Sequence, residues 1–183
     1  MQGSIFTVFS EMVIEKLGME TWNELLETVK PESEGIYTKG MYYEDSEMMA
    51  LVGALSKKTN TDAPTLVRTF GSYLFIHLYN SSPAKLSHID NLKDFLRSID
   101  SVIHKEVKRV YPQAYLPSFD YSETPEGDLV MLYQSKRKLC HLSEGLISSA
   151  AAHFNQEVTI TQPECMHNGA DKCKLIISIK DKE

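Results

Sequence analysis

The chain has 183 residues, of which 42% are hydrophobic and 9% aromatic, and its formal net charge is -6. This size and composition suit one folded domain with a sizeable core and exclude a disordered chain. The acidic balance argues against a nucleic-acid-binding protein, whose surface would carry a clustered basic patch.

Neither a membrane span nor a signal peptide is evident. No segment has the roughly 20 consecutive apolar residues that cross a bilayer, and residues 1–13 lack a basic stretch and contain Glu11. We therefore expect a cytoplasmic protein that binds neither membrane nor nucleic acid. The three cysteines are widely spaced and odd in number, which favours reduced thiols or metal ligands over a disulfide framework.

Apolar residues at helical spacing predict several helices in the first half of the chain. The first contains Ile5 to Leu17 and ends at Gly18, a typical C-terminal cap. The others cover residues 19–29, 46–59 and 63–79, with a loop over 31–43 that contains proline and glycine. We expect residues 1 to about 60 to form a mostly helical N-terminal subdomain.

A longer helix is predicted over residues 92–111, ended by Pro112. Its expected apolar stripe comprises Phe95, Ile99, Val102, Ile103, Val107 and Val110. His104 lies at the shoulder of this stripe, where it is either an ordinary half-buried histidine or an imidazole that reaches into a cavity. Glu106 falls near the middle of the stripe, and the pattern offers no reason for it.

From Leu129 the apolar period changes to two, which predicts a β-strand. The alternation continues through YQSKR at residues 133–137 and places Tyr133, Ser135 and Arg137 on one face. A helix over about 139–154 and two β-rich segments, 157–162 and 173–179, follow. The chain thus reads as an α+β protein and a single domain, 1–183. Residues from about 61 to 183 would form a subdomain with an antiparallel sheet and helices.

Two hydroxyls and a guanidinium on one face can bind an anionic carboxylate or phosphate. A strand end that emerges into water would give the same pattern. An isolated imidazole such as His104 suits haem iron, which needs one protein ligand and keeps its opposite face open. In that case Tyr133, Ser135 and Arg137 would bind the haem propionates.

With these residues the chain resembles the haem-nitric oxide/oxygen binding (H-NOX) domains, sensor modules related to the haem domain of soluble guanylate cyclase. The resemblance covers essentially the whole length. It is carried by YQSKR at 133–137, the helix segment DSVIHKEVKRVYP around His104, YLPSF with Pro117, and the opening MQGSIF with Ile5.

The resemblance implies that haem b is buried between the two subdomains. His104 would be the proximal iron ligand, and Tyr133, Ser135 and Arg137 would clamp the propionates. Ile5 and Pro117 would press on the porphyrin and distort it.

The distal side of the haem decides which gas binds. By the same resemblance, its wall is apolar and consists of Phe9, Leu74, Leu78, Leu142 and Leu146. Oxygen-binding members have a tyrosine at the position matched by Leu142. Bound O2 gains from a hydrogen-bond donor, whereas NO binds ferrous haem without one. We therefore expect a nitric oxide sensor that excludes O2 and is not an enzyme, although an ordinary core would contain the same residues.

The resemblance also implies how the signal would leave the domain. NO opposite His104 would weaken the iron–histidine bond and free the helix of residues 92–111, and the N-terminal helices would pivot as the porphyrin relaxes. The chain ends soon after its last strand. As in stand-alone bacterial members, we expect a separate partner, first a histidine kinase of a two-component system and otherwise a cyclic-di-GMP enzyme.

A second metal site is predicted, with four candidate ligands for structural zinc: Cys140, Cys165, His167 and Cys173. Unconnected thiols are the alternative. A subset of H-NOX proteins resembles the run CMHNGADKC at 165–173, but some of them place the fourth ligand at the position of Gln162. Thiolate oxidation could release the zinc and provide a redox input.

Three other functions fit parts of the pattern. The first is a zinc/thiol redox sensor based on the three cysteines, and the second a haem-free module that binds an apolar acid through Arg137. The third is an enzyme with Cys140 as its nucleophile. His141 would serve Cys140 poorly as a base, because adjacent helical residues diverge by about 100 degrees.

Overall fold

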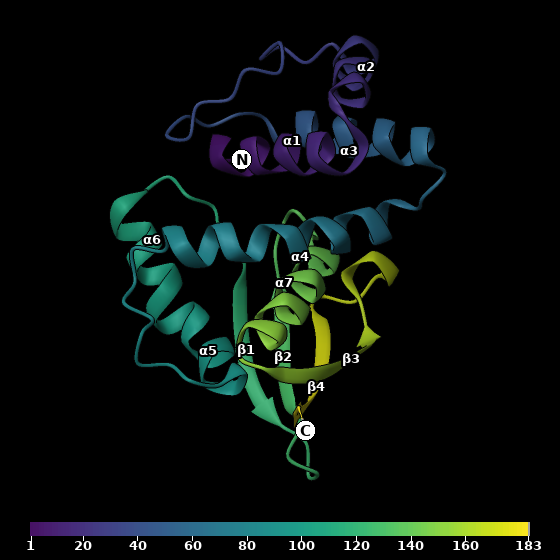
Figure 1. Ribbon diagram of the computed structural model, residues 1–183. Helices are drawn as coiled ribbons and strands as arrows, with labels where there is room; N and C mark the ends of the chain where they lie inside the picture. The colour runs from purple at the N-terminus through teal and green to yellow at the C-terminus, as the bar shows by residue number, and fades with distance from the viewer. Residues whose placement is uncertain (183) are drawn as a thin grey trace.

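The computed structural model describes residues 1–182 and has helices stacked over a β-sheet (Figure 1). The helices in chain order are α1 (Gly3–Leu17), α2 (Met19–Val29), α3 (Asp45–Thr59), α4 (Ala63–Ser81), α5 (Leu92–Ser98), α6 (His104–Val110) and α7 (Cys140–His153). Helices α1 to α3 lie together on one side of α4, and α7 lies between α4 and the sheet. No helix within residues 1–182 is long and apolar enough to cross a membrane.

The sheet has four antiparallel strands in the order β1-β2-β4-β3. They are β1 (Ser118–Glu123), β2 (Leu129–Gln134), β3 (Gln156–Glu164) and β4 (Cys173–Asp181), with a short 3₁₀ helix η2 (Met166–Asn168) before β4. The expected α+β class with an antiparallel sheet is confirmed. The first strand was not predicted, because only Phe119 and Tyr121 mark its alternation.

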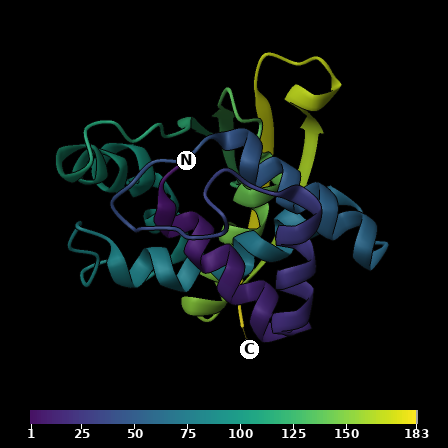
Figure 2. The same cartoon turned by 90° about the horizontal axis from the view of Figure 1, so that it is seen from above.

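Two apolar cores hold these layers together. The first joins α1, α2, α3 and part of α4, and the second joins α5, α7 and the sheet, where Leu129, Met131 and Tyr133 of β2 point inward as expected. Helix α4 belongs to both cores, since Leu74 is buried in the first and Phe75 in the second. The expected subdomain boundary near residue 60 falls in the connection that precedes this shared helix. Figure 2 shows the same arrangement from above.

Helices α4 and α7 pack closely because each has a glycine at their contact. A Cβ atom on Gly71 would overlap the carbonyl oxygen of Leu142, and one on Gly145 would overlap that of Arg68. Since only glycine lacks a Cβ, these two positions let the helix backbones approach each other directly. This contact fixes the place of Leu142 and Leu146 relative to α4.

The helix expected over residues 92–111 is helical throughout but not regular. Between α5 and α6 lies a π-helical turn, η1 (Ile99–Ile103), in which the N–H of His104 donates to the carbonyl of Ile99 five residues earlier. The extra residue in this turn changes the direction of the side chains in the turn and after it. The prediction of one continuous apolar stripe was therefore wrong: Val102 in the turn is 39% exposed, and Val110 beyond it is 51% exposed. Glu106 forms an ion pair with Arg109, in which Oε2 of the glutamate lies 3.6 Å from Nη1 of the arginine.

Candidate functional site

His104 opens α6 immediately after the π turn, and its side chain is only 17% exposed. Its Nδ1 atom lies 3.0 Å from Oδ1 of Asp100. Burial lowers the pKa of the imidazole below its usual value, and this effect outweighs the opposing influence of the Asp100 carboxylate. The ring is therefore neutral at physiological pH. With the proton on Nδ1 directed to Asp100, the lone pair of Nε2 is available to a metal.

An aromatic contact links His104 to the sheet. The ring of Phe119 in β1 lies 5.9 Å from the ring of His104 and 5.7 Å from that of Tyr133, its partner in the β1–β2 register. Sequence reasoning missed Phe119 because it missed β1. Tyr121, also on β1, has a buried hydroxyl with no hydrogen-bond partner in the part of the chain that the structure describes. Burial and the nearby Asp100 carboxylate raise the pKa of that hydroxyl.

Tyr133, Ser135 and Arg137 do not share a strand face as predicted. Strand β2 ends at Gln134, and the chain then turns, with Lys138 in the left-handed region at φ 50°. The reason is that backbone N–H groups bond to side-chain oxygens here instead of to a neighbouring strand. The N–H of Leu139 donates to the Tyr133 hydroxyl at 2.8 Å, and the N–H of Arg137 donates to Ser135 Oγ at 3.2 Å.

The turn nevertheless keeps the three polar groups together. Each hydroxyl oxygen accepts a bond from a backbone N–H, and the two hydroxyls also lie within hydrogen-bond reach of each other. A surface cavity of about 330 Å³ is lined in part by Tyr115, Ser135 and Lys136, whereas Tyr133 is buried and is not among its lining residues. The Ser135 hydroxyl can therefore be offered to an anionic group in this cavity.

The Arg137 guanidinium joins this turn to the N-terminal helices. Its Nε donates to Asp45 Oδ2 at 2.6 Å and its Nη1 to the carbonyl of Tyr115 at 2.8 Å. The N-terminal ammonium of Met1 lies 2.9 Å from the other carboxylate oxygen of Asp45. Burial opposes ionisation of Asp45, but the bonds from Arg137 and the N-terminus prevail and hold its pKa below the usual value.

Four of the five expected distal residues lie in or against the first core. Phe9 and Leu74 are buried there, and Leu142 and Leu146 of α7 pack against them. Leu78 lies apart, 39% exposed, one helical turn beyond Leu74. The two residues expected to distort a porphyrin are half-buried: Ile5 in α1 beside the first core, and Pro117 just before β1.

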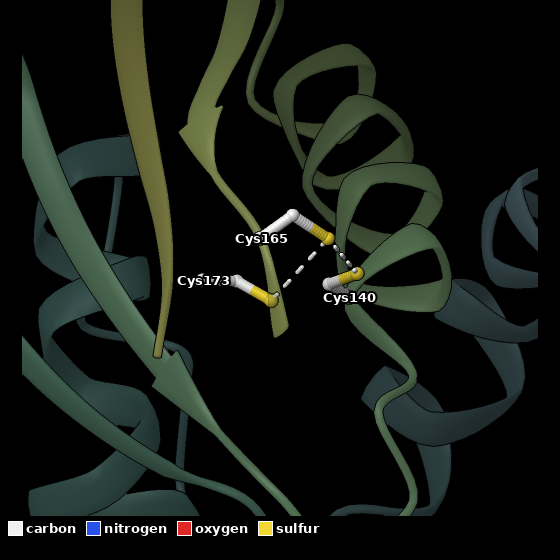
Figure 3. Close-up of side chains that lie close together, drawn as sticks. All are labelled: Cys140, Cys165 and Cys173. Carbon is white, nitrogen blue, oxygen red and sulfur yellow. Dashed lines mark hydrogen bonds between the residues drawn. The ribbon is translucent and has the colours of Figure 1, made fainter. Parts of the chain in front are cut away.

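The three cysteines meet in one buried cluster (Figure 3). The Sγ atom of Cys165 lies 3.8 Å from that of Cys140 and 3.9 Å from that of Cys173. They come from the start of α7, the segment after β3 and the start of β4. Burial raises the pKa of Cys140 and Cys173. The buried side-chain amide of Gln162 lies beside the Cys140 thiol, and its N–H opposes the effect of burial on the pKa of that thiol.

His167 lies at the edge of this cluster and is exposed. One of its ring nitrogens comes within 4.8 Å of Cys140 Sγ and of a ring nitrogen of His141, but His167 does not group with the other two thiols. Its Nε2 lies 2.7 Å from the carbonyl of Lys138, and its ring stacks on that of His141 with centroids 5.6 Å apart. Of the four predicted zinc ligands, the structure thus brings the three cysteines together and leaves His167 adjacent.

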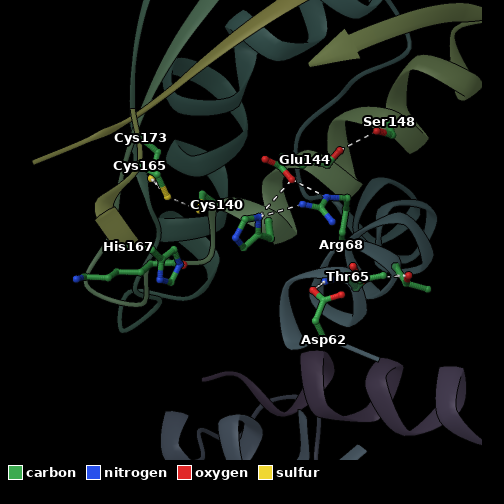
Figure 4. Close-up of polar contacts among 12 residues, drawn as sticks. Asp62, Thr65, Arg68, Cys140, Glu144, Ser148, Cys165, His167 and Cys173 are labelled. Atoms are coloured by element: carbon green, nitrogen blue, oxygen red, sulfur yellow. Dashed lines mark hydrogen bonds and ion pairs between the residues drawn. The ribbon is translucent and has the colours of Figure 1, made fainter. Parts of the chain in front are cut away.

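A polar network continues from the thiols to α4 (Figure 4). Nδ1 of His141 lies 3.3 Å from the Glu144 carboxylate, which also accepts a bond from Nε of Arg68 at 2.6 Å. Glu144 is 12% exposed and contacts both the Nδ1 atom of His141 and the Arg68 guanidinium. The network therefore ties the start of α7 to α4.

Comparison with known proteins gives a consistent result. The family model described as haem-NO-binding matches residues 2–162. The soluble guanylate cyclase gcy-32 of Caenorhabditis elegans is 30% identical over 87% of this chain, and gcy-34 from the same animal is 28% identical over 100% of this chain. The chain spans 24% and 28% of those two proteins, about a quarter of their length.

Solved structures match over the whole fold. An H-NOX protein from S. oneidensis in the Fe(II)NO state has a TM-score of 0.92 and 35% identity, and the match covers 99% of this chain and 100% of that one. The unliganded Fe(II) H-NOX protein from K. algicida has a TM-score of 0.90 and 33% identity, with 100% and 98% covered.

Proposed function

The chain belongs to the haem-NO-binding (H-NOX) family of haem-based gas sensors, and from this premise we propose that it senses nitric oxide and excludes O2. The observation that carries the selectivity is the apolar environment of Leu142. This side chain packs against the core that contains Phe9 and Leu74, and Leu146 lies one turn further along the same helix. No side chain among these can donate a hydrogen bond, so bound O2 would gain no stabilisation there.

The donor set around His104 fits haem b. Haem supplies an iron that binds NO and whose bond to an imidazole NO weakens. His104 is neutral and held through Nδ1, so its Nε2 would ligate the iron. Tyr133 and Ser135 can each donate an O–H to a propionate, and Arg137 would add its positive charge.

Signal output would begin at His104 and at the Arg137 turn. Loss of the iron bond would free α6 from the haem, and the Arg137–Asp45 pair would carry movement at the propionate end to α3. We propose that the domain has no catalytic activity of its own. Its partner would be a separate histidine kinase, or a cyclic-di-GMP enzyme as the second choice.

Absorption spectra of the ferrous protein, without gas, with NO and in air, test this function. Wild type should contain five-coordinate haem, form a five-coordinate NO complex and form no O2 complex. His104→Gly should need added imidazole to hold haem, whereas His88→Gly, in an exposed loop, should behave like wild type. A stable O2 complex would refute the selectivity, and tight haem binding by His104→Gly would refute the ligand assignment.

We further propose that the cysteine cluster binds structural zinc and so provides a redox input. Three soft thiols within 4.8 Å of one another suit a tetrahedral zinc site. The Gln162 amide beside Cys140 would donate its N–H to the thiolate that zinc binding requires. His167 would be the fourth ligand and would give up its contact with the carbonyl of Lys138.

Metal analysis of the purified protein tests the zinc site. Wild type should contain one zinc per chain, and Cys165→Ser should contain none. If His167 is the fourth ligand, His167→Ala should lower zinc affinity and Gln162→Ala should not. If Gln162→Ala lowers zinc affinity and His167→Ala does not, Gln162 is the fourth ligand. If wild-type protein contains no zinc, the three cysteines do not form a metal site.

A further inference from the structure

The carboxylate of Asp100 is the feature near the haem ligand that the proposed function has not used. It lies four residues before His104 and accepts the Nδ1 proton of that imidazole at 3.0 Å. The side chain of Asp100 is 38% exposed, so its carboxylate could be hydrated by water, yet it points at the imidazole ring. Among the ion pairs of residues 1–182, His104 is the partner of Asp100.

The surroundings of Asp100 favour a fixed hydrogen bond. The π turn η1 contains Asp100 and ends at Ile103, and the N–H of the next residue, His104, donates to the carbonyl of Ile99. The ring of Phe119 packs near the imidazole, with the two ring centroids 5.9 Å apart. π turns inside helices occur frequently at functional sites, and this one holds donor and acceptor on a short, closed segment of backbone.

A carboxylate at this position changes what the imidazole can do as a ligand. A histidine that donates its second ring N–H to a carboxylate is held in one tautomer and orientation, and it becomes a more basic ligand. The bond from Nε2 to a metal is then stronger. In a sensor that responds by breaking this bond, the carboxylate sets how readily the bond breaks.

We propose that Asp100 is a positioning residue that strengthens the bond between His104 and haem iron and thereby sets how fast NO breaks it. This inference rests on the proposed haem function and deepens it. After the bond breaks, the contact with Asp100 keeps the imidazole on the surface of its own helix. The ring and the turn η1 then move together.

The same helix supplies a matched control. Glu106 is a carboxylate two residues after His104, but its carboxylate pairs with Arg109 and not with the imidazole. Glu106→Gln therefore removes the same charge from the same helix without touching Nδ1. Asp100→Asn keeps the size of the side chain and weakens the hydrogen bond, so it is the variant least prone to misfold.

Resonance Raman spectroscopy of the ferrous, NO-free protein gives the first measurement. The iron–histidine stretching frequency should be lower in Asp100→Asn than in wild type and unchanged in Glu106→Gln. Stopped-flow mixing with NO gives the second. The conversion of the six-coordinate to the five-coordinate NO complex should be about tenfold faster in Asp100→Asn, the lower end of the usual effect of losing an outer-shell partner.

The outcomes separate this inference from the proposed function. If both variants shift the frequency equally, or if neither does, Asp100 has no specific role and the inference is wrong. If wild type does not bind haem through His104, the proposed function fails first. Nitrogen-15 NMR of the haem-free protein adds an independent check, because wild-type His104 should carry its proton on Nδ1 and lose this preference in Asp100→Asn.

Discussion

The Nε atom of Arg137 lies 2.6 Å from Oδ2 of Asp45, although 92 residues separate the two in the chain. The pair connects the turn after β2 to the first residue of α3. The pair links the predicted propionate clamp directly to the N-terminal helices.

Asp45→Asn should lower the free energy of unfolding at pH 7 by about 1 kcal/mol. A hydrogen bond between charged groups contributes about 1.5–3 kcal/mol, and the partial exposure of Asp45 reduces this. Because the folded pKa of Asp45 is depressed, wild type has this stability in full above the unfolded pKa of about 3.9 and loses it as the pH falls further.

Urea denaturation at pH 7, 5 and 3 measures this effect. The difference between wild type and Asp45→Asn should be present at the two higher pH values and shrink at pH 3. Glu44→Gln, which changes the neighbouring exposed carboxylate, should stay close to wild type throughout. A difference between wild type and Asp45→Asn that does not depend on pH would contradict the assignment.

Gly71→Ala should destabilise the protein by about 1–3 kcal/mol, since an added methyl group must push α4 away from the backbone of α7. Gly53→Ala is the control, because no atom lies within 4 Å of a Cβ built there. In that open helical position alanine should stabilise the protein by about 0.5–1 kcal/mol. The thermal unfolding temperature should therefore fall in Gly71→Ala and rise in Gly53→Ala. Equal shifts in the two variants would argue against the close contact between α4 and α7.

Leu142→Tyr should introduce a hydrogen-bond donor into the distal pocket and allow a ferrous O2 complex to form in air. Leu142→Phe adds a ring of similar size without a hydroxyl, so it should bind no O2. Absorption spectra recorded before and after exposure to air measure both variants. O2 binding by the phenylalanine variant would show that steric factors, not the donor, decide selectivity.

Glu144→Gln should destabilise the protein by about 1–3 kcal/mol, because it leaves Arg68 without its charged partner at the α4–α7 contact. A double-mutant cycle with Arg68→Met isolates the pair. We expect the double variant to cost less than the sum of the single variants. Strict additivity would mean that the pair contributes no coupling.

Periodicity predicted most of the fold. The period of apolar residues located α1 to α4, α7 and strands β2, β3 and β4, and it covered α5 and α6 with one helix, since burial on one face leaves a repeating pattern. It missed β1, where Phe119 and Tyr121 are the two large apolar residues of a six-residue strand. It also missed the π turn, because an extra residue in one helical turn depends on backbone hydrogen bonds that the sequence does not display.

The candidate site was predicted in part. The cysteine cluster could be foreseen from residue types, and the structure brings those three thiols together. The Arg137–Asp45 pair could not, because it joins residues far apart in the chain. The contact between Asp100 and His104 has the common i, i+4 spacing, but only the π turn shows how their side chains meet.

Helix α4 contributes to both apolar cores, and this shared membership determines how the molecule can come apart. A fragment that stops at residue 60 would lack Phe70 and Leu74, so its helices would have no complete interior. The rest of the chain would expose the flank of α4 that those helices cover. The two halves should therefore fold and unfold as one cooperative unit, in a single thermal transition. Any movement of one half relative to the other should bend helix α4, which both share.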